Sequence, residues 1–269
     1  MAREEDLARI RAALRRAGDV LVEMSRRRVR VFHKDNGSPV TEADLAADDL
    51  LRAELPRDGE GWLSEETADD PARLGRRRVW IVDPLDGTRE FLAGVPEWCV
   101  SIALAEDGVA VAGGVLAPLL GEQILGGPET GVTLNGRPVR ASSRARLAGG
   151  VVLVDRWALR RRSGRVLLGR GFGVRAVGPL AYTLALVATG RADATWGRSA
   201  KAEWDIAAGA ALVAAAGGHV SDAAGRPLAF NRWPPRAPGV MACGAGLARE
   251  VERLVSEEAA RAAASRRRP

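Results

Sequence analysis

Several residue types that mark particular classes of protein are scarce in this 269-residue chain. Only two cysteines are present, Cys99 and Cys243, which excludes a disulfide-stapled small domain, and we expect both thiols to be reduced. The longest weakly polar run, residues 206–218, is mostly alanine and glycine and is shorter than the ~20 residues needed to span a bilayer. The first residues lack the basic-then-apolar order of a secretory signal. These absences predict a cytoplasmic protein without a membrane helix.

Lysine and aromatic residues are also rare. The formal net charge is +6, but Lys34 and Lys201 are the only lysines, and the arginine triplets are scattered along the chain. The twelve aromatic side chains do not interleave with these triplets, so neither a basic stripe nor a stacking platform for bases is visible. Nucleic acid is therefore not the partner that we expect.

The hydrophobic pattern predicts layered helices and sheets in two halves, residues 1–145 and 146–269. Amphipathic helices are expected near residues 4–25 and after Thr41, and a meander of short β-rich runs follows from residue 79. Asn135-Gly136 is a hairpin signal. In the second half, strands and helices alternate. The expected elements are strands at 151–154, 166–168, 192–196 and near 240, and helices near 157–162, 180–189, 206–216 and from about 246.

Four acidic segments lie at the edges of these expected elements: residues 37–44, 62–67, 80–91 and 202–209. The third is the most informative. An apolar strand ends at Asp83, Pro84 fixes the backbone, and Gly87 permits a tight turn before a helix. Asp83 and Asp86 therefore project from one loop, with the carbonyl of Leu85 between them.

Carboxylates that crowd together repel unless cations neutralise them, and hard divalent cations prefer oxygen ligands. Glu65, Asp83, Asp86 and Asp205 would suit two Mg²⁺ ions that share Asp83. Two such ions activate water and stabilise the oxygens of a displaced phosphate. At the start of the next helix, the backbone N–H groups of Gly87 and Thr88 are expected to hold a phosphate.

Each segment also has a purely structural interpretation. Asp44 lies three residues after Thr41, as in a capping box, and Asp205 is placed to cap a helix of small residues. Glu65 and Glu66 are consistent with an acidic loop. Residues 83–88 are consistent with a turn held by hydrogen bonds to aspartate side chains. Spacing alone does not bring the four segments together.

At these residues the chain resembles the magnesium-dependent, lithium-sensitive phosphatases, the inositol monophosphatase superfamily. The resemblance runs from about Leu7 to Phe230 with the four motifs in order, and within the superfamily it is closest to the bisphosphate nucleotidases of the CysQ type. It implies an α-β-α-β-α sandwich of the sugar-phosphatase type and two or three Mg²⁺ ions. The resemblance also suggests a homodimer.

The resemblance also assigns roles to individual residues. It implies that Glu65, Asp83 and the Leu85 carbonyl bind one metal ion, whereas Asp83, Asp86 and Asp205 bind the second. Glu65 is further implied to lie near the water that this first ion polarises.

The same resemblance implies that Thr88 and Asp44 orient the attacking water. This role is compatible with helix capping by Asp44, because one carboxylate has two oxygens.

Substrate choice rests on the surrounding basic residues. Arg89 and Glu90 follow Thr88, as in the nucleotidase branch. Inositol phosphatases usually have asparagine directly after this threonine. Candidate contacts to a second phosphate are Arg89, Arg156, Arg198 and Lys201.

Three departures oppose the nucleotidase assignment. Pro179 and Thr183 replace residues that contact substrate in nucleotidase relatives, and Asp155 places an acid where a phosphate would approach. The metal site matches the family, but the specificity residues do not.

Our principal hypothesis is a Mg²⁺-dependent phosphomonoesterase that removes the 3′-phosphate of adenosine 3′,5′-bisphosphate by attack of water. The alternatives are an inositol-1-phosphate or fructose-1,6-bisphosphate phosphatase with the same chemistry, and a non-catalytic polyanion-binding protein.

Overall fold

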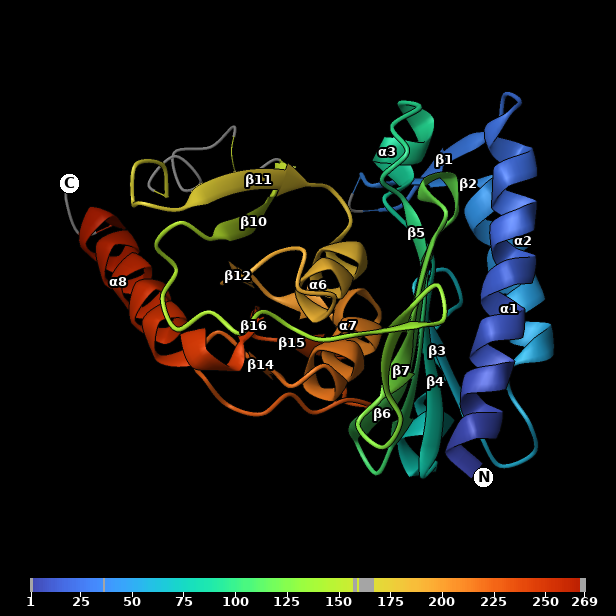
Figure 1. Cartoon of the computed structure of the whole chain (residues 1–269). Coiled ribbons are helices and arrows are strands. Elements are labelled where there is room, and N and C mark those ends of the chain that lie inside the picture. Colours follow the sequence, from blue (N-terminus) through green and yellow to red (C-terminus); the bar gives the residue numbers. More distant parts are fainter. Residues whose placement is uncertain (1, 36, 157–158, 160–166, 267–269) are drawn as a thin grey trace.

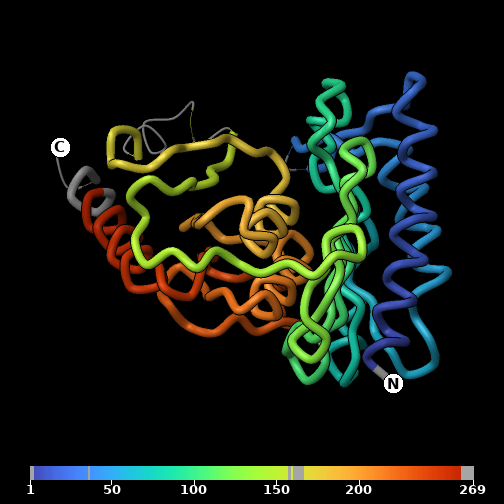
Figure 2. The backbone as a smooth tube through the Cα atoms, viewed as in Figure 1, coloured from blue at the N-terminus to red at the C-terminus, as the bar shows by residue number. Residues whose placement is uncertain are grey.

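The computed structural model describes residues 2–35, 37–156, 159 and 167–266. The elements stack as five layers, in the order helices, sheet, helices, sheet, helix (Figure 1). The first and last long helices form the two outer layers (Figure 2). This is the predicted α-β-α-β-α sandwich. Within the described residues, no helix combines the length and the apolar character that crossing a membrane requires.

The first outer layer consists of α1 (Ala2–Ser25) and α2 (Glu42–Glu54), with a small β1–β2 hairpin between them in the chain. These helices cover one face of a seven-stranded sheet of order β3-β4-β5-β6-β7-β8-β9. Strands β3 and β4 are parallel, and every other neighbouring pair is antiparallel. The bounds are β1 Val31–His33, β2 Pro39–Thr41, β3 Gly61–Ser64, β4 Arg78–Asp86, β5 Cys99–Glu106, β6 Val109–Ala117, β7 Glu122–Gly127, β8 Gly131–Leu134 and β9 Arg137–Val139.

Two helices, α6 (Leu180–Ala188) and α7 (Glu203–Ala215), fill the space between this sheet and a second sheet. The second sheet has the order β11-β10-β12-β16-β14, and α8 (Ala248–Arg266) packs on its outer face. A short pair, β13 and β15, lies at the start of α7. The bounds are β10 Val151–Asp155, β11 Gly173–Val177, β12 Ala194–Gly197, β13 Lys201–Ala202, β14 Gly218–Ser221, β15 Arg236–Ala237 and β16 Val240–Gly244.

The seven-stranded sheet is packed closely on both faces, and two adjacent glycines in β6 show why. A Cβ atom on Gly113 would lie 2.6 Å from the carbonyl oxygen of Ala208 in α7. A Cβ atom on Gly114 would lie 2.5 Å from a methyl carbon of Ile10 in α1. Successive strand residues face opposite sides of a sheet, so each glycine lets one helix layer approach. The close packing holds α7, which carries Asp205, directly against the sheet that carries Asp83.

Most sequence predictions for the first half are confirmed. The capping box of α2 forms, because the Thr41 hydroxyl accepts from the backbone of Asp44 and the Asp44 carboxylate accepts from Thr41. The hairpin turn at Asn135-Gly136 joins β8 to β9. Both cysteines are free and buried. The meander is preceded by β3, which sequence reasoning missed. The predicted division at residues 145 and 146 stays a prediction.

Predictions for the second half need corrections. The helix expected near 157–162 lies largely outside the described residues, and so does Val166 of the strand expected at 166–168. Leu167 and Leu168 form a turn, and the strand is β11 instead. Gly169 and Gly171 have positive φ angles, which end any extended run there. Helix α7 begins three residues earlier than predicted.

Candidate metal centre and active site

The end of β4 carries two of the predicted ligands. The strand was expected to end at Asp83, but it continues to Asp86, and its register with β5 shifts between these two residues. Gly87 follows with φ of 100° and precedes α3 (Thr88–Leu92). A Cβ atom on Gly87 would lie 2.8 Å from a ring carbon of Pro179, so both the backbone angle and the space require glycine. Asp83 is buried within β4, and Asp86 lies at the end of the strand, directly before the turn.

Carboxylates from three separate elements meet at this point. Because β3 and β4 are parallel, Glu65, which follows β3, lies beside the end of β4, and its N–H donates to the Val82 carbonyl over 3.3 Å. Asp205 comes from the first turn of α7. Glu65, Asp83 and Asp205 each offer one oxygen, and these oxygens all lie within 4.8 Å of one another. The convergence that spacing alone could not establish is therefore present.

The charges in this cluster are unfavourable in the absence of a cation. Burial and the neighbouring carboxylates, Glu65 first among them, raise the pKa of Asp83 well above its ordinary value. Burial and Asp205 do the same for the pKa of Asp86. Burial, again with Glu65, raises the pKa of Asp205 to about 7. A hard divalent cation bound by these oxygens would remove the repulsion, so the donor set fits Mg²⁺.

Asp86 lies beside the three-carboxylate cluster and has a second attachment. Its Oδ2 accepts a hydrogen bond of 2.7 Å from the N–H of Ala181, in the first turn of α6. This bond links the carboxylate at the end of β4 to the start of α6. Its ligand role and that of the Leu85 carbonyl stay predictions.

Asp44 and Thr88 form the predicted pair. The Thr88 hydroxyl donates to Asp44 Oδ1 over 2.9 Å, while Asp44 Oδ2 accepts from the Thr41 N–H over 2.8 Å. Asp44 thus caps α2 with one oxygen and holds Thr88 with the other. Burial raises the pKa of Asp44 despite these hydrogen bonds, which makes it a better proton acceptor.

Asp205 is not the N-cap that the sequence predicted. Ala202 is the N-cap of α7, and Asp205 is the third helical residue. The Asp205 carboxylate accepts a hydrogen bond from the backbone of Ala202, which is half of a capping box. Asp44 and Asp205 therefore occupy equivalent positions in two helices that start at the site.

Lys34 is a site residue that sequence reasoning missed. It follows β1, and its Nζ lies 2.8 Å from Glu65 Oε1 and 2.9 Å from Glu66 Oε1. Burial would lower the pKa of Lys34, but the two carboxylates outweigh burial and raise it. Burial raises the pKa of Glu66 to about 7 in spite of Lys34. The rarity of lysine in this chain was the one available signal.

The predicted contacts to a second phosphate are only partly placed at the site. Arg156 pairs with Glu97, and its Nε lies 3.4 Å from Glu90 Oε1. Arg198 is exposed and donates to the backbone carbonyl of residue 258 on α8.

The other two predicted contacts are Lys201 and Arg89. Lys201, in β13, is near enough for its charge to lower the pKa of Asp205, which burial raises. Arg89 is exposed on α3, next to Thr88. Their substrate roles stay predictions.

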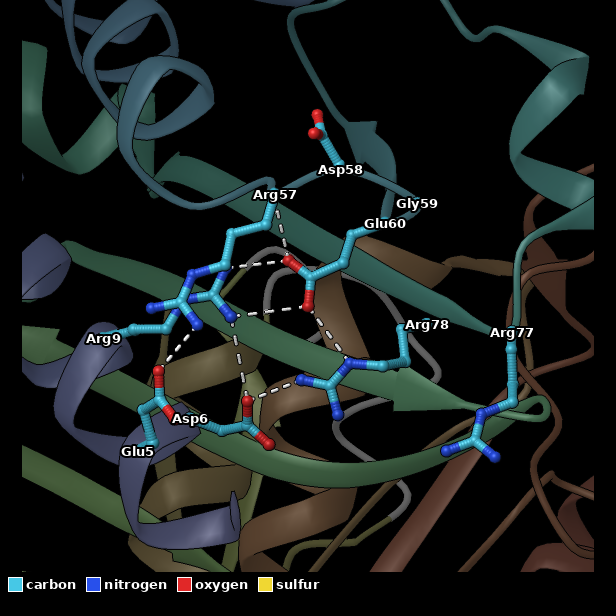
Figure 3. Close-up of a pocket in the computed structure, with 9 residues that line it drawn as sticks. All are labelled: Glu5, Asp6, Arg9, Arg57, Asp58, Gly59, Glu60, Arg77 and Arg78. Carbon is cyan, nitrogen blue, oxygen red and sulfur yellow. Dashed lines mark hydrogen bonds and ion pairs between the residues drawn. The ribbon is translucent and has the colours of Figure 1, made fainter.

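A pocket of about 380 Å³ lies at the opposite end of β4, around Arg78 (Figure 3). Ion pairs cross it: Arg9 lies 2.7 Å from Glu60, Arg57 lies 2.6 Å from Glu5, and Arg78 contacts both Asp6 and Glu60. The lining residues are Glu5, Asp6, Arg9, Arg57, Asp58, Gly59, Glu60, Arg77 and Arg78. Its arginines and carboxylates balance in charge, so this pocket is not the predicted metal site.

Comparisons with known proteins identify the family. Residues 3–262 match the inositol monophosphatase family. An inositol-1-monophosphatase of Mesorhizobium japonicum is 38% identical over 72% of this chain and 76% of its own. A histidinol-phosphatase of Chlorobaculum parvum is 36% identical over 78% of this chain and 83% of its own. The solved structure of an IMPase from Thermotoga maritima superposes with a TM-score of 0.83 at 28% identity, covering 97% of this chain and 99% of the other. The chain belongs to the inositol monophosphatase family, and it is a phosphomonoesterase.

Proposed function

We propose that the protein hydrolyses a small phosphate monoester with Mg²⁺ by direct attack of water, without a phosphoenzyme. The observation that carries this proposal is the meeting of Glu65, Asp83 and Asp205, whose oxygens lie within 4.8 Å of one another. Bound Mg²⁺ would supply charge neutralisation, polarise water and stabilise the phosphate oxygens. The predicted number of two or three ions is part of this proposal.

The protein's own groups would orient the water and receive its proton. The Thr88 hydroxyl donates to Asp44, so its lone pairs are left to accept from a water beside the carboxylate cluster. The water transfers a proton to the Thr88 hydroxyl, and the hydroxyl in turn transfers its own proton to Asp44 Oδ1. The Thr41 bonds to Asp44 Oδ2 keep the carboxylate in place during this transfer. The backbone N–H groups of Gly87 and Thr88 are proposed to hold the phosphate.

For the substrate, we propose a polyol monophosphate such as inositol 1-phosphate ahead of adenosine 3′,5′-bisphosphate. Carboxylates hold Arg156, and Arg198 bonds to the backbone of α8. The subsite for a second phosphate thus has fewer cations than the sequence suggested. The relative named inositol-1-monophosphatase supports the same order. The nucleotidase remains the second candidate, because Lys201 lies near Asp205 and the pair Arg89-Glu90 follows Thr88.

A phosphate-release assay tests the chemistry and the substrate together. Inositol 1-phosphate, adenosine 3′,5′-bisphosphate, fructose 1,6-bisphosphate and histidinol phosphate would each be measured with Mg²⁺ and with a chelator. We include histidinol phosphate because one relative carries the name of that phosphatase. We expect Mg²⁺-dependent turnover with the highest kcat/KM for inositol 1-phosphate. A tenfold preference for the nucleotide would reverse the substrate order, and turnover unaffected by the chelator would refute the proposal.

The Asp83→Asn variant tests the site directly. We expect kcat/KM to fall by about 100-fold or more, since losing even a partner of a metal ligand costs 10- to 100-fold. Asp222→Asn is the matched control, because Asp222 is also buried but lies outside the carboxylate cluster. Near wild-type turnover by Asp83→Asn would contradict the proposed role of the cluster. A cytoplasmic location and a homodimer remain proposals.

A further inference from the structure

The start of α7, where Asp205 lies, has an unusual attachment. The N-cap residue Ala202 supplies no side-chain hydrogen bond to the helix. Instead, the N–H of Glu203 donates to the Pro235 carbonyl over 3.0 Å, and β13 pairs with β15 just before the helix. The Pro235 carbonyl, in the segment that precedes β15, therefore accepts a hydrogen bond from the start of α7, as the Thr41 side chain does at the start of α2. Interactions that fix this segment therefore also help to fix the position of Asp205.

The carboxylate of Glu203 binds this segment. Glu203 is fully buried, and its Oε2 accepts from the N–H of Asn231 over 2.7 Å. Its Oε1 accepts from the N–H of Arg232 over 2.9 Å. A buried carboxylate is costly without such donors, so both bonds contribute to fixing the helix start. Asn231 has a positive φ of 58°, which turns the two N–H groups toward the carboxylate.

Arg73 ties the same segment to the other half of the chain. It lies in a short 3₁₀ helix, Pro71–Gly75, in the connection from β3 to β4, and it is 2% exposed. Its Nη1 donates to the Asn231 side chain over 2.6 Å, and its carbonyl accepts from the Asn231 amide over 3.1 Å. Its Nη2 donates to the Arg232 carbonyl over 3.0 Å.

Asp69 holds the guanidinium of Arg73 from the opposite side. Nε and Nη2 of Arg73 donate to the two oxygens of Asp69 over 2.5 and 2.7 Å. This bidentate geometry fixes the plane of the guanidinium and so its direction toward Asn231. The chain of bonds runs from the connection that follows Glu65 to the helix that carries Asp205.

We propose that Arg73, Asn231 and Glu203 form a clamp that positions Asp205 against Glu65 and Asp83 for metal binding. None of the three clamp residues is proposed as a ligand. They act through the backbone of α7, two residues from Asp205. The inference rests on the metal-dependent function proposed above, and it adds the reason why an acid from the second half of the chain meets acids from the first.

Mg²⁺ affinity tests the clamp, measured by titration calorimetry at a temperature well below the unfolding of every variant. Glu203→Gln keeps the shape of the side chain but presents an amide N–H₂ to a backbone N–H. Asn231→Gly removes the bonds to Arg73 while keeping the positive φ. We expect each change to raise the Kd for Mg²⁺ about tenfold, the effect usual for partners of metal ligands. Arg73→Lys keeps the charge but loses the bidentate geometry of the guanidinium, so we expect a smaller increase in the Kd for Mg²⁺.

Glu60→Gln is the matched control. Glu60 is also a carboxylate held by hydrogen bonds, in the pocket at the opposite end of β4 (Figure 3). We expect it to lower the melting temperature but to leave the Kd for Mg²⁺ unchanged, which separates positioning from general stability. If Glu203→Gln does not fold, Asn231→Gly decides the question. Wild-type Mg²⁺ affinity in the clamp variants would overturn the inference, whereas a wild-type protein that does not bind Mg²⁺ would instead refute the proposed function.

Discussion

The carboxylate cluster makes a prediction about stability whose sign is unusual for a change at a buried residue. In metal-free protein at pH 7, we expect Asp83→Asn to increase the free energy of unfolding. Asp83 is 1% exposed, and its nearest charged neighbours are carboxylates. The oxygens of the cluster lie within 4.8 Å of one another, and at that largest separation two unit charges repel by about 3.5 kcal/mol at an effective dielectric constant of 20. Asparagine removes this repulsion and can donate to the remaining carboxylates.

Proton uptake by Asp83 limits the size of this stabilisation, because a protonated carboxyl is no longer repelled by its neighbours. Keeping a carboxyl of ordinary pKa 3.8 protonated at pH 7 costs about 4 kcal/mol. We therefore expect Asp83→Asn to add about 2 to 4 kcal/mol in the absence of metal, or roughly 5 to 12 °C in melting temperature.

The pH dependence has a definite sign. The pKa of Asp83 is raised in the folded state, so the folded protein keeps a proton that the unfolded chain has released above about pH 4. The stability of the wild-type protein consequently falls as pH rises from about 4 toward neutrality. The advantage of Asp83→Asn should vanish near pH 4.

Thermal melts in EDTA and in Mg²⁺ would measure these effects. Mg²⁺ should raise the melting temperature of the wild-type protein and have little effect on Asp83→Asn. Asp222→Asn is the control, because hydrogen bonds from Ala224 and Arg226 outweigh burial and lower the pKa of Asp222. The same substitution there should destabilise by about 1 to 2 kcal/mol. A less stable Asp83→Asn in EDTA, or equal stabilisation of both proteins by Mg²⁺, would refute the reasoning.

Three further predictions concern single side chains. Burial would raise the pKa of Glu60, but hydrogen bonds from arginine and tryptophan side chains lower it to about 2. The ionised Glu60 carboxylate therefore stabilises the fold by about 1 to 2 kcal/mol after allowing for solvent. This contribution is present above about pH 4.5 and is lost as pH falls toward 2. Melts of Glu60→Gln and wild type should therefore differ at pH 7 and converge near pH 2. Lys34→Gln removes a cation that competes for Glu65, so calorimetry should show Mg²⁺ binding about threefold to tenfold more tightly; weaker binding would contradict this. Thr88→Val removes the hydroxyl held by Asp44, and kcat should fall about 100-fold with unchanged Mg²⁺ affinity; a loss of metal binding instead would assign Thr88 to the metal.

Local features of this protein were determined by the sequence alone. The Thr41 and Asp44 pattern predicted the capping box, Gly87 predicted a tight turn before a helix, and Asn135-Gly136 predicted the hairpin. Each of these local structures depends on interactions among a few residues that are neighbours in the sequence. The four acidic segments were likewise identified, because residue type and order are sequence properties.

Only the tertiary structure decided which of these acids share a site and which cations have other partners. Glu65 and Asp205 are far apart in the chain, and they meet through the parallel pairing of β3 with β4 and the packing of α7 on the sheet. The partners of Arg156 and the bonds between Arg73 and Asn231 are equally long-range. Such contacts depend on how layers pack, and no short motif encodes that. The sequence therefore determined the chemistry available, and the packing determined where it is assembled.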